Sequence, residues 1–283
     1  MKSENQPLVS VCIPCYNAET TIRETIDAIL HQTYTNMEII VCDDKSIDNT
    51  VEILKSYTDP RIKIVLNEQN KGHIGNYNTA IFEAKGKYLK LQCADDLITT
   101  DCIEKEVAVF LENTDKNLVM VTSEKRVINE KGEILFKKPF PGKAGFHIGI
   151  DIIKKTARYG TNIIGEPGAP LLLTAAVHKA GGITIPKELN YLTENDLWCR
   201  MLQHGNLFVV KEPLFLYRIV ETSDSVKSQR WKQAKVYNKW VREYVDKKLV
   251  ELSFFDKMMA FLSAWLLCIA RNVVYVFANK KLR

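Results

Sequence analysis

Short apolar runs and amphipathic helical patterns alternate through the first hundred residues of this chain. The apolar runs are bounded by turn-forming residues and are typical of buried strands; they read LVSVCIPCYN, MEIIVCDD, RIKIVLN and KYLKLQC. Helical patterns begin near Thr20, Asn49 and Gly75, and we expect the last helix to end at Gly86. This alternation predicts an α/β fold in which a mostly parallel sheet carries helices on both faces.

Two pairs of adjacent acids follow strand-like runs. Asp43 and Asp44 end the second run, and Asp95 and Asp96 follow the fourth. Because ligands of open α/β sheets bind outside the carboxyl ends of the strands, both pairs are expected to face one crevice, which suggests a metal-bound nucleotide. A turn is the alternative for each pair, since Asp favours turns. No glycine-rich dinucleotide or P-loop motif occurs, so side chains must hold the nucleotide.

Composition limits the class of protein. Of 283 residues, 46% are hydrophobic and 26% are charged, which is ordinary for a globular protein and excludes a disordered or fibrous one. Seven cysteines, an odd number, favour reduced thiols in a cytosolic protein. Cys12 and Cys15 form a C-x-x-C, but we interpret them as small buried hydrophobes rather than a zinc or redox site. The polar start and the early Pro14 predict that no signal peptide is present.

The motifs in their order resemble those of family 2 glycosyltransferases of the GT-A fold. The matching segments run roughly from Leu8 to Tyr217 and read VSVCIPCYNAETTIRETIDAILHQTYTNMEIIVCDDKSIDNT, NKGHIGNYNTAIFEAKGKYLKLQCADDLI, IIGEPGAPLLL and YLTENDLWCRML. The resemblance implies the Rossmann-like GT-A sheet and transfer of a sugar from a nucleotide diphosphate donor. Three segments are expected: a nucleotide-sugar-binding half (1–100), an acceptor-binding half (101–220) and a C-terminal helical extension (221–283).

The resemblance also implies roles for particular residues. Tyr16 is expected against the nucleobase, Asp44 as the acceptor of a hydrogen bond from the base, and Asp95 at the ribose. Asp96, with Asp95 beside it, is expected to bind a divalent cation, Mg²⁺ or Mn²⁺, that bridges the two phosphates. Cys93 stands where the family often has the first acid of a D-x-D motif. The other donor-site candidates are Pro14, Asn17, Asn70, Gly72, Asn76 and Glu166, with His73 nearby and with Asp43 and Asp48 as loop supports.

Chemistry favours the same arrangement. A cation held by carboxylates neutralises the charge that develops on a diphosphate leaving group. The attacking hydroxyl needs a general base, and a direct displacement with one base inverts the anomeric carbon. By the resemblance, Glu194 falls on the catalytic acid of the family and Asp196 on a supporting acid, and we keep both as catalytic candidates. Stabilisation of a helix N-terminus is the alternative for this pair.

Two further features have two interpretations each. The loop around Glu166 either contacts the substrate or is an ordinary tight turn. Arg200 is expected to reach either phosphate or a nearby acid.

The composition changes after Tyr217. A basic helical stretch with interleaved aromatics runs from Lys227 to Lys248, and an apolar run follows from Met258 to Ala270. Thirteen residues fall short of the roughly 20 that span a bilayer. The helical spacing predicts an amphipathic helix; its apolar side would carry Phe261, Leu262, Trp265, Leu266, Ile269, Val273 and Val276, opposite Asp256, Lys257, Ser263 and Arg271. It would dock on an anionic membrane surface rather than nucleic acid, or else pack against the catalytic domain or a partner chain.

The sequence therefore predicts an inverting glycosyltransferase on the inner face of the cell membrane. The expected donor is a nucleotide diphosphate sugar. Uracil is the first choice of base and thymine the alternative, because both present the same N–H edge to Asp44. The expected acceptor is a hydroxyl of a lipid-linked glycan in surface polysaccharide synthesis. One alternative is a nucleotidyltransferase, although the stretch from Asn17 to Thr21 has no basic residue for a triphosphate. The other is a non-catalytic scaffold that keeps the fold.

Overall fold

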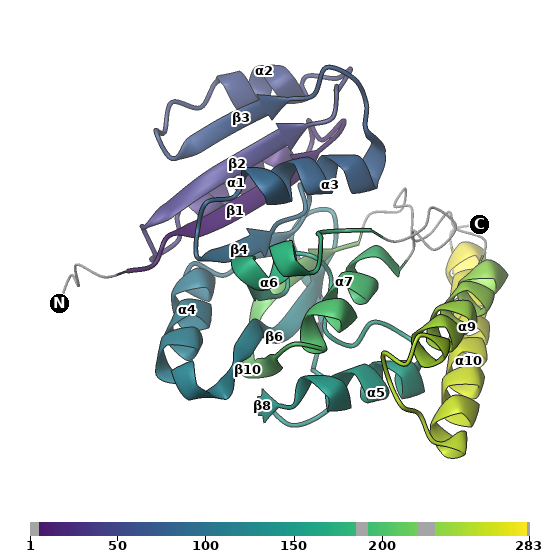
Figure 1. Ribbon diagram of the computed structural model, residues 1–283. Helices are drawn as coiled ribbons and strands as arrows, with labels where there is room; N and C mark the ends of the chain where they lie inside the picture. Colours follow the sequence, from purple (N-terminus) through teal and green to yellow (C-terminus); the bar gives the residue numbers. More distant parts are fainter. Residues whose placement is uncertain (1–5, 185–191, 220–229, 282–283) are drawn as a thin grey trace.

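The computed structural model describes residues 6–184, 192–219 and 230–281 (Figure 1). One mixed sheet of ten strands runs through the described part of the chain, in the order β3-β2-β1-β4-β9-β6-β10-β5, with β7 beside β6 and β8 beside β10. The strands are β1 (Val9–Cys15), β2 (Met37–Asp43), β3 (Ile62–Leu66), β4 (Tyr88–Leu91), β5 (Leu97–Ile98), β6 (Leu118–Ile128), β7 (Ile134–Lys138), β8 (Gly145–His147), β9 (Leu171–Leu173) and β10 (Asn206–Arg218).

The first four strands are parallel, as the alternation predicts. Val9 of β1 lies opposite Met37 of β2 and Tyr88 of β4, and Cys15 lies opposite Asp43. The next strand across the sheet, β9, is antiparallel to both β4 and β6, and β10 runs parallel to β6. The sheet is therefore mostly parallel on the β1 side and mixed on the other.

Helices cover both faces of the sheet (Figure 1). Strand β1 packs into a core on each side: Val9, Val11 and Ile13 join one hydrophobic cluster and Cys12 joins the other. A strand that is buried on both faces reads as a continuous apolar run, which is why its sequence predicted a parallel sheet.

The helices are α1 (Ile22–Leu30), α2 (Thr50–Lys55), α3 (Gly72–Glu83), α4 (Cys102–Glu112), the 3-10 turn Thr114–Lys116, α5 (Gly149–Tyr159), α6 (Thr174–Lys179), α7 (Thr193–Leu202), α9 (Arg230–Asp246) and α10 (Phe254–Lys281).

Helix α3 ends earlier than the sequence predicted. It ends at Glu83, and the following Ala84 is already extended. Gly86 therefore lies beyond the cap position of the helix, and a Cβ added there would lie 2.6 Å from the backbone nitrogen of Ser10. The glycine instead allows the chain to pass close to β1 before β4 begins.

The C-terminal helices α9 and α10 lie side by side next to α5 (Figure 1). Small residues of α10, including Ala260 and Ala264, are buried, and a Cβ on Gly160 would lie 2.5 Å from the Ala264 nitrogen. Tyr237 of α9 donates a hydrogen bond to the Thr156 carbonyl at 2.7 Å. One face of the pair therefore packs against α5 and the core of the chain, which is the packing alternative to membrane docking.

Most of the apolar side predicted for α10 faces away from this contact, but Trp265 of that side is partly buried and packs against the core. Phe261, Leu262 and Ile269 are exposed, and Leu266 is 63% exposed. Asp256, expected on the polar side, is instead buried, paired with Arg158, and bonded to Ser253. The side chains of Arg271, Val273 and Val276, which were also assigned to the two sides of this helix, lie outside the described residues, as do residues 227–229 of the basic stretch. Among the described residues, no helix combines the length and apolar character needed to cross a bilayer.

Candidate functional site

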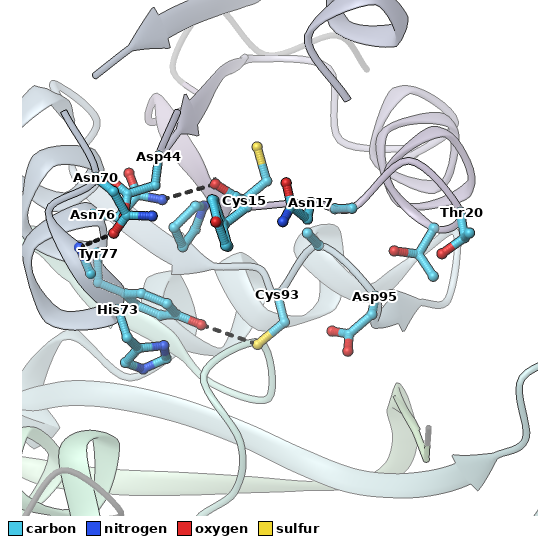
Figure 2. Close-up of a pocket in the computed structure, with 16 residues that line it drawn as sticks. Cys15, Asn17, Thr20, Asp44, Asn70, His73, Asn76, Tyr77, Cys93 and Asp95 are labelled. Atoms are coloured by element: carbon cyan, nitrogen blue, oxygen red, sulfur yellow. Dashed lines mark hydrogen bonds between the residues drawn. The ribbon is translucent and has the colours of Figure 1, made fainter. Parts of the chain in front are cut away.

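A pocket of about 610 Å³ opens at the carboxyl ends of β1, β2 and β4 (Figure 2). Most of the predicted donor-site residues line it, although they come from segments far apart in the sequence. Those on its wall are Pro14, Tyr16, Asn17, Asp44, Asn70, Gly72, Asn76 and Asp95, together with His73. Four other predicted site residues do not line this pocket: Asp96, Glu166, Glu194 and Asp196.

Asp44 is held by two donors on one carboxylate oxygen. Asn67 Nδ2 donates to Asp44 Oδ1 at 2.9 Å, and the Lys71 backbone N–H donates at 2.8 Å. The Asn67 amide also bonds Asn76, which in turn donates to the carbonyls of Cys15 and Cys42. This buried amide network fixes Asp44 against the ends of β1 and β2 and leaves its second oxygen for another partner.

The loops around Asp44 are shaped by backbone constraints. Asn17 has a φ of 49°, and its side-chain oxygen accepts from the Ile47 backbone at 2.9 Å. Asn70 Oδ1 accepts from the backbone of Gly72, whose φ of +71° favours glycine. Tyr16 is 49% exposed at the mouth of the pocket and offers an aromatic face.

Asp43 and Asp48 support these loops, as predicted. Asp43 Oδ2 accepts from the Ser46 backbone at 2.9 Å. Asp48 Oδ1 accepts from the Thr50 backbone at 3.0 Å, at the start of α2.

Two residues of the site were not predicted from the sequence: Asn67, which bonds Asp44, and Tyr77, which lines the pocket. An Asn after a strand and a Tyr within a helix carry no motif.

Cys93, Asp95 and Asp96 gather beyond the end of β4. One potential ligand atom from each lies within 4.8 Å of the other two. Asp95 and Cys93 line the pocket, whereas Asp96 is buried and its Oδ1 accepts from the Arg218 backbone at 2.8 Å. Burial raises the pKa of both carboxyl groups, and Asp95 adds to the rise at Asp96. Carboxylate oxygens and a cysteine sulfur are donors that a divalent cation can use, so the set fits one.

Arg218, at the end of β10, orients this acidic segment. Its side chain is 2% exposed. The guanidinium donates to the Asp95 carbonyl at 2.7 Å, to the Glu130 carbonyl at 2.8 Å and to Glu24 at 2.6 Å. Sequence reasoning missed Arg218, because an Arg that ends a strand looks the same whether it faces solvent or a buried carbonyl.

Glu194 lies in the first turn of α7, beside the pocket wall. Its side chain keeps partial contact with solvent but is enclosed by protein, and this burial raises its pKa to about 7. The charge of Glu166 adds to the rise. Glu194 in turn raises the pKa of Cys93 and of Tyr77, both on the wall. A carboxylate with such a pKa can take up a proton near neutral pH.

Glu166 lies in the loop before β9 and pairs with Lys125 of β6. Burial acts to raise the pKa of Glu166, but Lys125 and Lys138 outweigh burial and hold it below the ordinary value. Gly165 has a φ of +140°, and the Glu166 carbonyl accepts from the Ala169 backbone at 2.9 Å. The loop is thus a tight turn, and it also brings a charged acid near Asp96 and Glu194.

Asp196 faces the other side of α7. Arg200 donates to it at 2.7 Å, and Trp240 and Tyr244 of α9 donate at 3.1 and 3.0 Å. Arg200 was expected to reach either phosphate or a nearby acid, and in the structure it pairs with the acid Asp196. Asp196 therefore joins α7 to α9, and the structure brings Glu194, but not Asp196, close to the pocket.

Residues 10–157 match the family described as glycosyl transferase family 2. The chain is 33% identical over 232 residues to EpsE of Bacillus subtilis, which is described as a glycosyltransferase, with 78% of this chain and 76% of EpsE covered. It is 42% identical over 106 residues, 38% of this chain and 42% of the relative, to WfgD of Escherichia coli, a UDP-Glc:alpha-D-GlcNAc-diphosphoundecaprenol beta-1,3-glucosyltransferase.

Two solved structures share the fold. One is S. aureus TarS 1-349 in complex with UDP-GlcNAc, with a TM-score of 0.68 and 18% identity over 92% of this chain and 72% of that one. The other is the mannosyltransferase PcManGT from Pyrobaculum calidifontis with GDP-Man and Mn²⁺, with a TM-score of 0.61 and 16% identity over 99% of this chain and 82% of that one. The fold is the GT-A fold, as predicted, and this chain belongs to family 2 of the glycosyltransferases.

Proposed function

We propose that this protein transfers a sugar from a UDP-sugar to a hydroxyl of a lipid-linked glycan, with inversion at the anomeric carbon, in surface polysaccharide synthesis. Residues 1–100 would bind the nucleotide sugar, and 101–220 would bind the acceptor. The observation that carries the proposal is the pocket that Asp44, Tyr16 and Asp95 line together, with the acids Asp96 and Glu194 beside it.

The pocket wall suits a uridine. Asp44 keeps one carboxylate oxygen free of the Asn67 and Lys71 bonds, and that oxygen can accept the N–H of a uracil ring. Tyr16 offers an exposed ring on which a base can stack. The TarS structure is a complex with UDP-GlcNAc, and WfgD is named for the donor UDP-Glc, which supports the choice of uridine.

Asp95 and Asp96, with Cys93 beside them, would hold a divalent cation. Such a cation supplies positive charge to the departing diphosphate. Enzymes of this fold typically use one, and the PcManGT structure contains Mn²⁺. Arg218 supports the acids from behind, because it bonds the Asp95 carbonyl and the Asp96 carboxylate.

Glu194 is the proposed general base. It would take the proton of the acceptor hydroxyl as that oxygen attacks the anomeric carbon, and its pKa of about 7 suits this task. Asp196 is bonded to Arg200, Trp240 and Tyr244, so its contribution would be to hold α7 in place. A single base without a carboxylate nucleophile gives inversion.

The acceptor would be reached from a membrane surface on the cytoplasmic side. The 221–283 segment carries basic residues, and α10 exposes Phe254, Phe255, Phe261 and Leu266. An exposed apolar helix face with basic neighbours can lie in the interface of an anionic bilayer. WfgD is named for a diphosphoundecaprenol-linked acceptor, which supports a lipid-linked substrate for this chain.

Product stereochemistry tests the reaction. The protein is incubated with candidate UDP-sugars, Mn²⁺ and a diphosphoundecaprenol-linked acceptor, and the new linkage is examined by NMR. We expect the anomeric configuration opposite to that of the donor; retention would contradict the proposed mechanism.

Flotation with anionic vesicles tests the membrane surface. The wild type should float with anionic vesicles, and a Phe261→Ser, Leu266→Ser double variant should bind them less. Neutral vesicles serve as the control.

A further inference from the structure

Cys93 differs in its surroundings from the other thiols of the chain. Its side chain is partly exposed and lines the pocket, between Tyr77 and Asp95 (Figure 2). The other six thiols are at most 3% exposed and belong to the core clusters; they are Cys12, Cys15, Cys42, Cys102, Cys199 and Cys268. Cys15 also lines the pocket, but its sulfur is buried and faces the Cys42 carbonyl, so Cys93 is the thiol that a bound nucleotide or its cation can reach.

The position of its sulfur matches that of a ligand. Cys93 Sγ lies within 4.8 Å of a carboxylate oxygen of Asp95 and of Asp96, a spacing at which all three atoms can share one ion. Tyr77 is the hydrogen-bond partner of the sulfur, with Oη and Sγ 3.4 Å apart. The phenol can donate to a thiolate that also binds a metal, as supporting groups do around metal ligands.

We propose that the Cys93 thiolate is a third protein ligand of the cation, beside Asp95 and Asp96. This inference rests on the proposed function, because it concerns the same site. On binding, the thiol releases its proton to solvent while the metal–sulfur bond forms. A sulfur ligand favours softer ions, and carboxylates alone suit Mg²⁺ and Mn²⁺. The site would therefore prefer Mn²⁺, Co²⁺, Zn²⁺ or Cd²⁺ to Mg²⁺ more strongly than an all-oxygen site would.

The direct test is the absorption spectrum with Co²⁺. A Co²⁺–thiolate bond gives a charge-transfer band in the near ultraviolet, at longer wavelength than the absorption of uracil. The full-length protein is titrated with Co²⁺ in the presence of UDP, and the wild type should develop this band. Cys93→Ser should lose it. Cys15→Ser is the matched control and should keep it, because Cys15 lines the same pocket but its sulfur faces the Cys42 carbonyl.

A second measurement compares ions. Affinity for UDP is measured by calorimetry with Cd²⁺ and with Mg²⁺. Cys93→Ser should weaken the Cd²⁺-dependent affinity by about tenfold and change the Mg²⁺-dependent affinity little. Cys93→Asp should shift the preference toward Mg²⁺, because it replaces the sulfur with a carboxylate and gives an all-oxygen set.

The outcomes separate this inference from the proposed function. If UDP binds with Mn²⁺ but no thiolate band develops and Cys93→Ser leaves the order of ions unchanged, the inference is overturned while the proposed function stands. If UDP binds with none of the ions, the proposed function fails, and the inference fails with it.

Discussion

The backbone N–H of Arg218 donates to the carboxylate of Asp96 at 2.8 Å, although the two residues are 122 positions apart. The Arg218 guanidinium also donates to the Asp95 carbonyl at 2.7 Å. Arg218 ends β10 and the two acids follow β4, so Arg218 adds to the pairing of β10 with β5 a second link between the second half of the sheet and the acidic segment. The position of the proposed cation ligands therefore depends on folding of the whole sheet.

Arg218→Lys should weaken cation-dependent binding of UDP. A lysine ammonium cannot bond Asp95, Glu130 and Glu24 together, so a buried carbonyl loses its donor, at a cost of about 1–3 kcal/mol in the free energy of unfolding. Calorimetry with UDP and Mn²⁺, together with urea unfolding, measures both effects. Arg61→Lys is the control, because Arg61 makes a partly exposed pair with Asp59, and it should change neither quantity by more than about 1 kcal/mol. Equal behaviour of the two variants would contradict the role of Arg218.

The rate of transfer should rise with pH and level off above neutrality. Burial raises the pKa of Glu194 to about 7, and a general base acts only when it is deprotonated. The profile of kcat/KM should therefore rise through a midpoint near 7. Glu194→Gln should lower kcat by about 10²–10⁴ while UDP still binds. A profile that is flat between about pH 5 and 8 would argue against Glu194 as the base.

Glu194 should also lower stability at high pH. Its folded pKa lies above the unfolded value of 4.5, so the folded state holds the proton more tightly and loses stability as pH rises toward and through 7. Glu194→Gln removes this loss. Thermal unfolding should show the variant to be more stable than the wild type by about 1–3 kcal/mol near pH 8 and nearly equal near pH 4. A variant that is less stable at the higher pH would show that the carboxylate is not penalised by its surroundings.

The sequence predicted the parallel half of the sheet and the residues around the pocket, because strands buried on both faces and acids at strand ends leave local patterns. It could not predict β9, three residues long and antiparallel between β4 and β6, because nothing local sets its direction. It also placed Glu194 and Asp196 together. The structure separates them because residues two positions apart lie about 200° apart around a helix, so one is beside the pocket wall and the other meets Trp240 of α9.

Asp196 is expected to act through stability. Asp196→Ala removes the acceptor of the Arg200 Nε–H and of the Trp240 indole N–H, and it leaves Tyr244 with only the backbone carbonyl of residue 196; the free energy of unfolding should fall by about 3–5 kcal/mol. Asp196→Asn keeps an acceptor oxygen and should cost less, about 1–2 kcal/mol, with kcat retained in the folded fraction. Urea unfolding and single-turnover rates measure the two. If Asp196→Asn abolished transfer and left the unfolding midpoint unchanged, Asp196 would take the place of Glu194 as the base.

Calorimetric titration of the full-length protein with UDP, with and without Mn²⁺, tests the central claim most directly. That claim is that the pocket lined by Asp44 and Asp95 binds a uridine nucleotide through a divalent cation. We predict binding that requires Mn²⁺, that is lost in Asp95→Ala, and that is weakened without loss of the Mn²⁺ requirement in Asp44→Asn. Binding of equal strength in the presence of EDTA, or in Asp95→Ala with Mn²⁺, would contradict it.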